Sequence, residues 1–402
     1  MKKILLLGGS AQQIIAIKTA KKMGIYTVLC DYLSDNPGQF EADKFYLVST
    51  TDKDKVLEVA RKEKIDGILA YASDPAAPTA AYVAEKMGLP GNPYDSVDIL
   101  CNKDKFRKFL RENNFNTPRA EGYSEVEAAY NDLKNGKLRF PVIVKPVDSS
   151  GSKGVSVITS CESIFSAAAA ALPFSRIGRF IAEEYIEKKY KYLTGGDIFV
   201  ADGEIVLWGL LNCHRDENVN PLVPVGKSYP LCLSSEDEAS VKKVLIKIVD
   251  KLGIRNGGMN VELIVDNGGN VWPIDVGPRN GGNMIPELLG CIFGVDVVEM
   301  SIMAAMGMST VQGFAQCHEG EKCYETLNLH SDRNGTLKVI NISPQIERYI
   351  IKKNIYKHIG DSVEYFDNAS KALGVIFMKF NSEEEMQRVN ERLSEWIKVE
   401  VE

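Results

Sequence analysis

The sequence predicts an α/β and α+β protein whose first part is a doubly wound parallel sheet. Residues 4–7 form a short apolar run that ends in Gly8-Gly9-Ser10, and a helical pattern of apolar residues follows. A second apolar run, residues 26–30, ends at Asp31. The order strand, glycine turn, helix, strand is typical of the start of a parallel sheet with crossover helices. The alternation continues, and we place the end of the first domain near residue 100.

Apolar periodicity and turn residues predict the later elements. In the first domain they are strands at 44–48 and 67–70 and helices at 54–63 and 79–87. Between 101 and 310 we expect helices at 103–115, 124–133, 236–252 and 296–306, and strands at 141–146, 155–158, 180–184, 196–201, 205–211, 260–265 and 271–276. From 311 to 402, strands at 337–342 and 372–380 and a helix at 382–395 indicate a small α+β cap.

Composition excludes several classes of function. The chain has 402 residues, 25% of them charged, and a net charge of −6, which argues against binding nucleic acid or an anionic membrane. No apolar stretch reaches the ~20 residues that span a bilayer. The eight cysteines are scattered without a Cys-x-x-Cys pair, and four histidines are too few to suggest a zinc cluster. We therefore expect a cytoplasmic protein with reduced thiols.

A glycine-rich loop follows a strand that ends in a lysine. Lys145 closes the apolar run 141–146, and the segment Asp148-Ser149-Ser150-Gly151-Ser152-Lys153-Gly154 comes next. Backbone N–H groups of such a loop can surround phosphate oxygens while the lysines supply positive charge. This is not a Walker A motif, because it lacks the Gly-Lys-Ser/Thr step. The pattern favours a polyphosphate site, and a surface hairpin is the alternative.

Two acids lie within neighbouring apolar strands. Glu262 and Asp275 flank the turn at 266–269, and antiparallel pairing can bring both onto one face. Two hard oxygen ligands without His or Cys favour Mg²⁺ shared with phosphates. Arg279 follows in an exposed loop that can deliver a guanidinium to a phosphoryl or carboxylate oxygen. The alternative is a structural salt bridge among the three residues.

The first glycine turn gives a weaker signal. Gly8-Gly9-Ser10 could place N–H groups against an anion, and Asp31 has the position of a ribose-binding acid in dinucleotide folds. The segment lacks the third glycine of that fingerprint, however. A tight strand-to-helix turn and a substrate-anion site are equally supported here.

Together these clusters resemble the ATP-grasp superfamily, over most of the chain. The resemblance rests on Asn102-Lys103-Asp104-Lys105, the Lys145 strand with its loop, Ile181-Ala182-Glu183-Glu184-Tyr185-Ile186, Asn260-Val261-Glu262, and Asp275-Val276-Gly277-Pro278-Arg279. It implies a pre-ATP-grasp domain at 1–100, a two-lobed ATP-grasp domain at 101–310 and a C-terminal cap at 311–402. The chain most resembles carboxylate–amine ligases of the N⁵-carboxyaminoimidazole ribonucleotide synthetase and glycinamide ribonucleotide synthetase groups.

The resemblance also implies roles for individual residues. Lys105 and Lys145 would contact ATP phosphates, with Lys145 and Arg279 in catalytic roles and Arg279 steadying an acyl-phosphate. Glu262 and Asp275 would hold Mg²⁺ or Mn²⁺. The cofactor would further contact the closing loop (Ser149, Ser150, Gly151, Ser152, Lys153, Gly154) and the link between the lobes (Glu183, Glu184, Tyr185, Ile186, Glu187), with Glu183 on adenine and Glu184 or Glu187 toward ribose.

The chain departs from the family pattern at the metal and substrate positions. Gly277 replaces a common asparagine ligand, so one ligand is missing or comes from Asn280. The substrate motifs of the purine enzymes are not evident, and the acid and the amine stay open. Candidate substrate-facing residues are Ser10, Ser73, Asp74, Arg215, Lys227 and Asn280.

We therefore expect an ATP-dependent, Mg²⁺-assisted ligase that joins a carboxylate to an amine through an acyl-phosphate. Its partners would be two small molecules, and a homodimer is possible by analogy with relatives. Three alternatives stand beside it: a phosphoribosylamine–glycine ligase or related purine enzyme, a dinucleotide-binding oxidoreductase, and a non-catalytic nucleotide-binding regulator.

Overall fold

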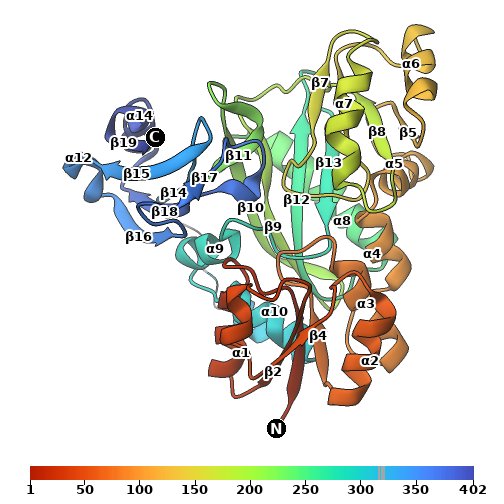
Figure 1. Cartoon of the computed structure of the whole chain (residues 1–402), viewed down its shortest axis with the longest axis vertical. Helices are drawn as coiled ribbons and strands as arrows, with labels where there is room; N and C mark the ends of the chain where they lie inside the picture. The colour runs from red at the N-terminus through yellow and green to blue at the C-terminus, as the bar shows by residue number, and fades with distance from the viewer. Residues whose placement is uncertain (316, 318–321) are drawn as a thin grey trace.

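The computed structural model describes residues 1–315, 317 and 322–402 (Figure 1). The N-terminal unit, red to orange in the figure, lies at one end of the molecule. A lobe built by residues near 105–185 lies at the opposite end, and a long central sheet runs between them. The C-terminal region projects from the side of that sheet. The expected mixture of α/β and α+β structure is confirmed.

The N-terminal unit is a parallel sheet in the order β3-β2-β1-β4. Apolar residues of β1 and β2 are almost fully buried because helices cover both faces of the sheet. The unit comprises β1 (Lys3–Leu7), β2 (Tyr26–Asp31), β3 (Lys44–Leu47), β4 (Gly67–Leu69), α1 (Ile14–Lys22), α2 (Lys53–Glu63), α3 (Ala77–Met87), α4 (Tyr94–Leu100) and the 3₁₀ turn Pro37–Phe40. The doubly wound opening predicted from the sequence is therefore confirmed.

The next lobe is an antiparallel sheet in the order β5-β8-β6-β7, with helices packed on one face. The side chain of Asn102 caps α5 by accepting from the Lys105 N–H at 3.2 Å, as a helix N-terminus requires. The lobe comprises α5 (Lys103–Glu112), β5 (Ala120–Tyr123), α6 (Val126–Lys134), β6 (Val142–Pro146), β7 (Ser156–Ile158), α7 (Ile164–Ala171), the 3₁₀ turn Leu172–Phe174 and β8 (Phe180–Glu184).

The central sheet has the order β13-β12-β9-β10-β11-β14-β18-β16. Helix α8 covers one face, and α9 and α10 pack on the other. The elements are β9 (Leu193–Ala201), β10 (Glu204–Asp216), β11 (Asn220–Tyr229), α8 (Ser235–Leu252), β12 (Gly257–Val265), β13 (Val271–Gly277), α9 (Ile285–Phe293), α10 (Val297–Ala305), α11 (Val311–Phe314), β14 (Cys323–Leu329), β16 (Ile350–Ile355) and β18 (Gly374–Phe380).

The C-terminal region is joined to the central sheet more closely than the sequence predicts. Strands β14, β18 and β16 continue the sheet beyond β11, so this part of the cap shares hydrogen bonds with the central strands. A smaller sheet, β17-β15-β19, completes the cap. Its elements are β15 (Gly335–Ile342), α12 (Pro344–Glu347), β17 (Ser362–Val363), the 3₁₀ turn Ala369–Lys371, α13 (Glu383–Asn390), α14 (Leu393–Trp396) and β19 (Ile397–Val401).

Helix α10 ties the N-terminal unit to the rest of the chain. Val298, Ile302 and Ala305 of α10 pack in one apolar cluster with Ile4 and Ile17 of the N-terminal unit. Figure 1 shows α10 (residues 297–305) beside β4 (67–69) and α1 (14–22), although these elements lie far apart in the sequence. Within the described residues, no single helix is long and apolar enough to cross a membrane, and only the bent pair α9 and α10 passes that test together.

Candidate active site

The two acids predicted within apolar strands face each other. Antiparallel pairing of β12 with β13 places Glu262 directly opposite Asp275, and a bulge follows Glu262. The hairpin turn is fixed by the Asp266 side chain, which accepts from the N–H groups of Gly268 at 2.8 Å and Asn270 at 2.9 Å. Directly opposed residues point to the same face of a sheet, so both carboxylates share one face. This prediction is confirmed.

Two carboxylates on one face of the sheet could together hold a divalent cation. Glu262 accepts a hydrogen bond from Arg215 of β10 at 2.5 Å, while the Asp275 carboxylate accepts no hydrogen bond from the described residues. Carboxylate oxygens are the ligands that Mg²⁺ prefers, and Mg²⁺ usually takes only one or two of them besides water and phosphate. In the described part of the chain, no group of three or more His, Cys, Asp or Glu residues could hold a metal. The pair therefore suits a cation completed by a bound phosphate.

Arg279 and Asp74 form a pair between the loop after β13 and the N-terminal unit. The Arg279 guanidinium contacts the Asp74 carboxylate and donates to the Asn280 carbonyl at 3.0 Å. A Cβ at Gly277 would lie 2.5 Å from the Asp74 carboxylate, so only glycine leaves room for this approach. Both side chains are largely buried, and the nearby carboxylates raise the pKa of Arg279 although burial opposes this. Arg279 is thus a fixed cation.

Lys145 belongs to a buried network of three charged side chains. Its ammonium contacts Glu183 of β8, and Arg107 of α5 donates to the same carboxylate at 3.0 and 3.4 Å. Burial raises the pKa of Glu183, but Arg107 and Lys145 outweigh it and lower that pKa to about 2. Burial lowers the pKa of Lys145, assisted by the nearby positive charge of Arg107. Glu183 therefore holds Lys145 in place and is not available to adenine in this arrangement.

The glycine loop is closed against the rest of the molecule. Ser152 donates to the Leu222 carbonyl at 2.9 Å, and Ala369 of the cap donates to the Gly151 carbonyl at 2.9 Å. Lys103 reaches the loop and donates to the Ser149 carbonyl at 2.7 Å. Gly151, Ser152 and Gly154 have positive φ, and a Cβ at Gly154 would lie 2.7 Å from the Ala170 carbonyl. The loop with Ser150 and Lys153 thus adopts a compact shape that depends on small residues.

The link between the lobes borders a groove. The segment 184–187 lines a cavity of about 490 Å³ together with Thr117, Arg119, Arg139 and the turn at 266–268. Tyr185 donates its N–H to the Pro141 carbonyl at 3.0 Å, and the Glu184 carboxylate pairs with Arg139 at 3.2 Å. Ile186 and Glu187 also face this groove. The arrangement agrees with a nucleotide-contacting link, although the role of each residue stays a prediction.

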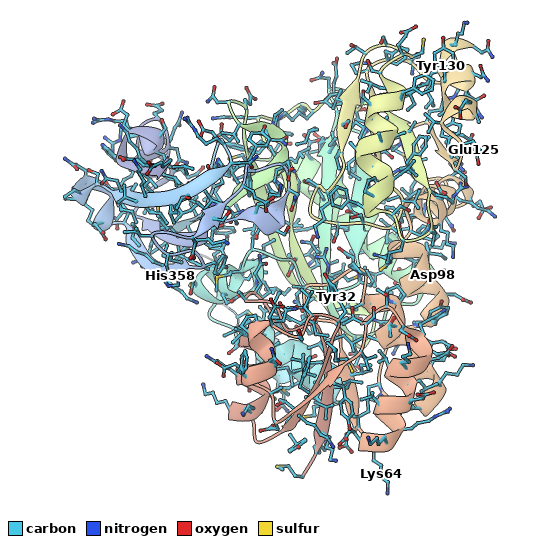
Figure 2. All side chains as sticks on the ribbon, in the orientation of Figure 1. Tyr32, Lys64, Asp98, Glu125, Tyr130 and His358 are labelled. Carbon is cyan, nitrogen blue, oxygen red and sulfur yellow. The ribbon has the colours of Figure 1, made fainter. Side chains whose placement is uncertain are left out.

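Several predicted site residues lie elsewhere than expected. The Lys105 ammonium contacts Asp98, which Figure 2 shows at the outer edge of the molecule. The lysine that reaches the glycine loop is Lys103. Asn280 is buried and bonded to Ser301 of α10 at 2.8 Å. It packs against Gly258, four residues before Glu262 along β12, so it does not replace the missing metal ligand.

The remaining substrate candidates divide into two groups. Arg215 lies at the acid pair, and Lys227 lies on the same face: a Cβ at Gly195, the residue opposite Glu262, would be 3.0 Å from its ammonium. Ser73 precedes Asp74 in the loop that contacts Arg279. Ser10 bonds to the side chain of Gln13 at 3.0 Å, which accounts for it structurally.

The first glycine turn is internally satisfied. Gly9 donates its N–H to Asp31 at 2.7 Å, and the Asp31 carboxylate also accepts from Leu33 at 2.9 Å and Asn36 at 2.6 Å. The Ser10 N–H donates to Gln13. The N–H groups of Gly9 and Ser10 and the Asp31 carboxylate already have hydrogen-bond partners, so they are not available to bind a dinucleotide in this arrangement. The structure supports the turn interpretation over an anion site.

Sequence reasoning missed two buried charged residues that organise the site. Arg107 lies on the buried face of α5 with Phe106 and Leu110, and its helical position was the available signal. Asp197 of β9 accepts from Gly281 N–H at 2.8 and 2.9 Å and from Asn260 at 2.9 Å, and burial raises its pKa to about 6. It fixes the start of the loop after Arg279.

Comparison with known proteins agrees with this geometry. Residues 138–287 match the family model of the ATP-grasp domain. The chain therefore carries an ATP-grasp domain, and the predicted family resemblance is confirmed. The N-terminal unit and the C-terminal region lie outside the matched segment.

Particular relatives refine the picture. The carbamoyl phosphate synthase large chain of Clostridium botulinum (strain Kyoto / Type A2) is 26% identical over 304 residues, covering 72% of this chain and 27% of that protein. The chain thus spans about a quarter of the length of the curated relatives it matches. An L-amino acid ligase from Bacillus licheniformis has a TM-score of 0.82 at 18% identity, covering 100% and 99% of the two chains. A phosphoribosylglycinamide synthetase from Anaerococcus prevotii has a TM-score of 0.77 at 22% identity, covering 100% of this chain and 100% of that chain. These structures establish the shared fold.

Proposed function

We propose that this protein is an ATP-dependent ligase that joins a carboxylate to an amine through an acyl-phosphate. One observation carries the proposal. Within an ATP-grasp fold, the paired carboxylates of Glu262 and Asp275 share a sheet face with Arg215 and Lys227. Such a face can hold a metal–triphosphate and a second anion at the same time, as phosphoryl transfer to a carboxylate requires.

The proposed reaction has two steps. A carboxylate oxygen of the first substrate attacks the γ-phosphorus of ATP, the bond to the β–γ bridging oxygen breaks, and ADP leaves. The amine then attacks the acyl carbon, phosphate leaves, and the nitrogen loses a proton to give the amide. The protein contributes by positioning both substrates and by excluding water.

Each charged residue has a proposed task in these steps. Arg279, held by Asp74, orients the carboxylate and the acyl-phosphate, since a guanidinium can donate two parallel hydrogen bonds to either group. Lys145 and Lys103 lie beside the phosphate-binding loop and stabilise the triphosphate. Lys105 stays a candidate only if its side chain leaves Asp98. The 149–154 loop covers the phosphates.

The cofactors in this proposal are ATP and Mg²⁺ or Mn²⁺. Glu262 and Asp275 would hold the cation, and when bound it would neutralise charge on the phosphate oxygens. Arg215 would then move from Glu262 toward a substrate anion, since a carboxylate bound to a cation is a weaker acceptor. Link residues Glu184 to Glu187 would contact the nucleoside. A cytoplasmic location and a homodimer also belong to the proposal.

The substrate class is open between two ligase types, each with a neighbour of the same fold. The likeness to an L-amino acid ligase over the full chain supports amino acids as both acid and amine. The likeness to phosphoribosylglycinamide synthetase supports glycine with a phosphorylated amine. We favour amino acids, because the substrate motifs of the purine enzyme are not evident in the sequence.

Phosphate release tests the proposal. The purified full chain would be incubated with ATP, Mg²⁺ and pools of amino acids, and separately with 5-phosphoribosylamine and glycine. We expect ADP and phosphate to appear only with an acceptor present, and the Glu262→Gln variant to lose this release while Ser10→Ala retains it. If no acceptor pool yields release above the ATP-only rate, the ligase proposal is wrong.

Two further measurements separate the other classes. A Lys145→Ala variant with unchanged acceptor-dependent ADP production would contradict the catalytic assignment and favour a nucleotide-binding regulator. Enhanced nicotinamide fluorescence on mixing NADH with the protein would favour the oxidoreductase. The occupied Asp31 carboxylate leads us to expect no such enhancement.

A further inference from the structure

A second cavity lies between the N-terminal unit and the start of β12. Its volume is about 560 Å³, and its walls come from α3, the segments 90–92 and 255–258, and helix α10 with the residues that follow it. The acids Glu262 and Asp275 and the lysine Lys145 are not among its lining residues. Gly257 and Gly258 line one end of the cavity and precede Glu262 by four to five residues on an extended strand, so that end lies roughly 13–17 Å from Glu262.

Two residues that line the floor of this cavity contain buried hydrogen-bond donors without acceptors among the described residues. Asn280 is only 2% exposed and lines the cavity, and its Nδ2 has no hydrogen-bond partner among the described residues. Its other amide atom is held by Ser301. Arg279 also lines the cavity, and its Nε is buried without an acceptor in the described part of the chain. A buried donor without an acceptor destabilises the folded protein. Two such donors close together therefore indicate a position where a ligand supplies the acceptor.

The walls and the rim of the cavity indicate the chemistry of the rest of a bound ligand. The walls are formed largely by small apolar side chains, among them Ala80 and Ala81 of α3 and Ala304 of α10. These would accept a short aliphatic group. At the rim, Arg255 is exposed and makes no ion pair within the described ranges, while Asp202 is the acid that lines the same cavity. Asp202 balances the charge of Arg255, and Asp74 balances that of Arg279.

We propose that this cavity binds a small aliphatic carboxylic acid. Its carboxylate would accept from Asn280 Nδ2 and Arg279 Nε on the floor, and its alkyl chain would lie against the alanines of α3 and α10. A carboxylate offers two acceptor oxygens to these two donors, whereas a primary amide offers only one. The ligand does not react here, because the acids and the loop lysines of the proposed active site lie outside the cavity. Arg279 lines this cavity and also belongs to the proposed active site. A ligand bound in one of the two sites should therefore change the affinity of the other site for its ligand.

Titration calorimetry on the full chain without ATP tests this site. The probe is 4-methylpentanoate, with acetate lacking the alkyl chain and 4-methylpentanamide lacking the charge. We expect 4-methylpentanoate to bind at least tenfold more tightly than either. An amide that binds as tightly as the acid, or no binding of the acid at millimolar concentration, would overturn the proposal.

Cavity-filling variants locate the binding. Ala304→Leu fills the space while keeping Asn280 intact, and we expect it to weaken 4-methylpentanoate binding by tenfold or more. The matched control is Ala169→Leu, the same change on the exposed face of α7, which should leave the affinity within twofold. Equal binding by Ala304→Leu and the wild type would place the probe elsewhere and refute the site.

The result of the probe-binding experiment does not depend on the result of the phosphate-release experiment that tests the proposed ligase. Probe binding is measured without nucleotide, so it can be present in a protein that releases no phosphate. Conversely, phosphate release with an amino acid acceptor can persist when the probe does not bind. Circular dichroism of each variant confirms that a lost affinity reflects the filled cavity rather than unfolding.

Discussion

Replacing Glu183 with glutamine should destabilise the protein by about 3–5 kcal/mol, because it leaves two buried cations without a counter-ion. The Glu183 carboxylate is in contact with Lys145 and Arg107, and the three side chains are between 1% and 8% exposed. Arg107 further donates to the carbonyls of Pro273 at 3.3 Å and Ile274 at 2.7 Å, so it cannot leave without losing these bonds. The network therefore has little freedom to relax.

The pKa of Glu183 gives a second measure of the same energy. It falls from an ordinary value of 4.5 to about 2, a difference that corresponds to about 3 kcal/mol. Because the folded pKa is depressed, this contribution is fully present above pH 4.5 and is lost as the pH falls toward 2. Between pH 4.5 and pH 2, the free energy of unfolding of the wild type should fall by this amount. The Glu183→Gln variant should lack this part of the fall, because it has no carboxyl group at position 183.

Urea unfolding followed by tryptophan fluorescence at pH 7 and at steps down to pH 2 would measure both effects. The matched control is Glu184→Gln, whose carboxylate pairs with the exposed Arg139 and should cost about 1 kcal/mol or less. A variant in which Glu183, Lys145 and Arg107 are all replaced by apolar residues should be less destabilised than Glu183→Gln alone. A Glu183→Gln protein within 1 kcal/mol of the wild type at pH 7 would refute the buried-network reasoning.

Three further variants test the proposed active site. Asp275→Asn should lower acceptor-dependent phosphate release by about 100-fold or more, since the cation would lose a charged ligand, and an unchanged rate at saturating Mg²⁺ would contradict the metal assignment. Asp74→Asn should lower the rate about 10- to 100-fold with a raised KM for the carboxylate, because Arg279 loses the carboxylate that holds it, and Asp54→Asn, the same change on an exposed residue of α2, is the control. Gly154→Ala should raise the KM for ATP about fivefold or more, since its Cβ meets the Ala170 carbonyl. Gly178→Ala has a similar positive φ but nothing within 4 Å, so an equal effect there would show that backbone strain alone is responsible.

Much of the fold and part of the site could be predicted because local patterns specify them. Apolar runs, glycine turns and the Asp266 turn predict β1, β2 and the β12–β13 hairpin. The same hairpin brings Glu262 opposite Asp275, since a short turn fixes the register of its two strands. Elements with weaker local signals were not predicted, such as β11 with its prolines and the strands β14, β16, β17 and β19.

Long-range partners of the charged residues could not be predicted in the same way. The sequence indicates that Lys145, Arg279 and Glu183 are chemically important, but not that Arg107 joins Lys145 at Glu183 or that Asp74 reaches across from the N-terminal unit. It likewise favoured Lys105 over Lys103, two residues that differ by half a turn of α5 and therefore face opposite sides of the helix.

Sequence by itself thus determined the order of the elements, the ATP-grasp resemblance and the pair of acids, all of which depend on residues close together in the chain. Only the tertiary structure decided which lysine reaches the glycine loop, that the first glycine turn satisfies its own N–H groups, and that α10 packs into the N-terminal unit. The physical reason is that charge pairing and burial are set by distances in space, and the packing of segments far apart in the sequence sets those distances.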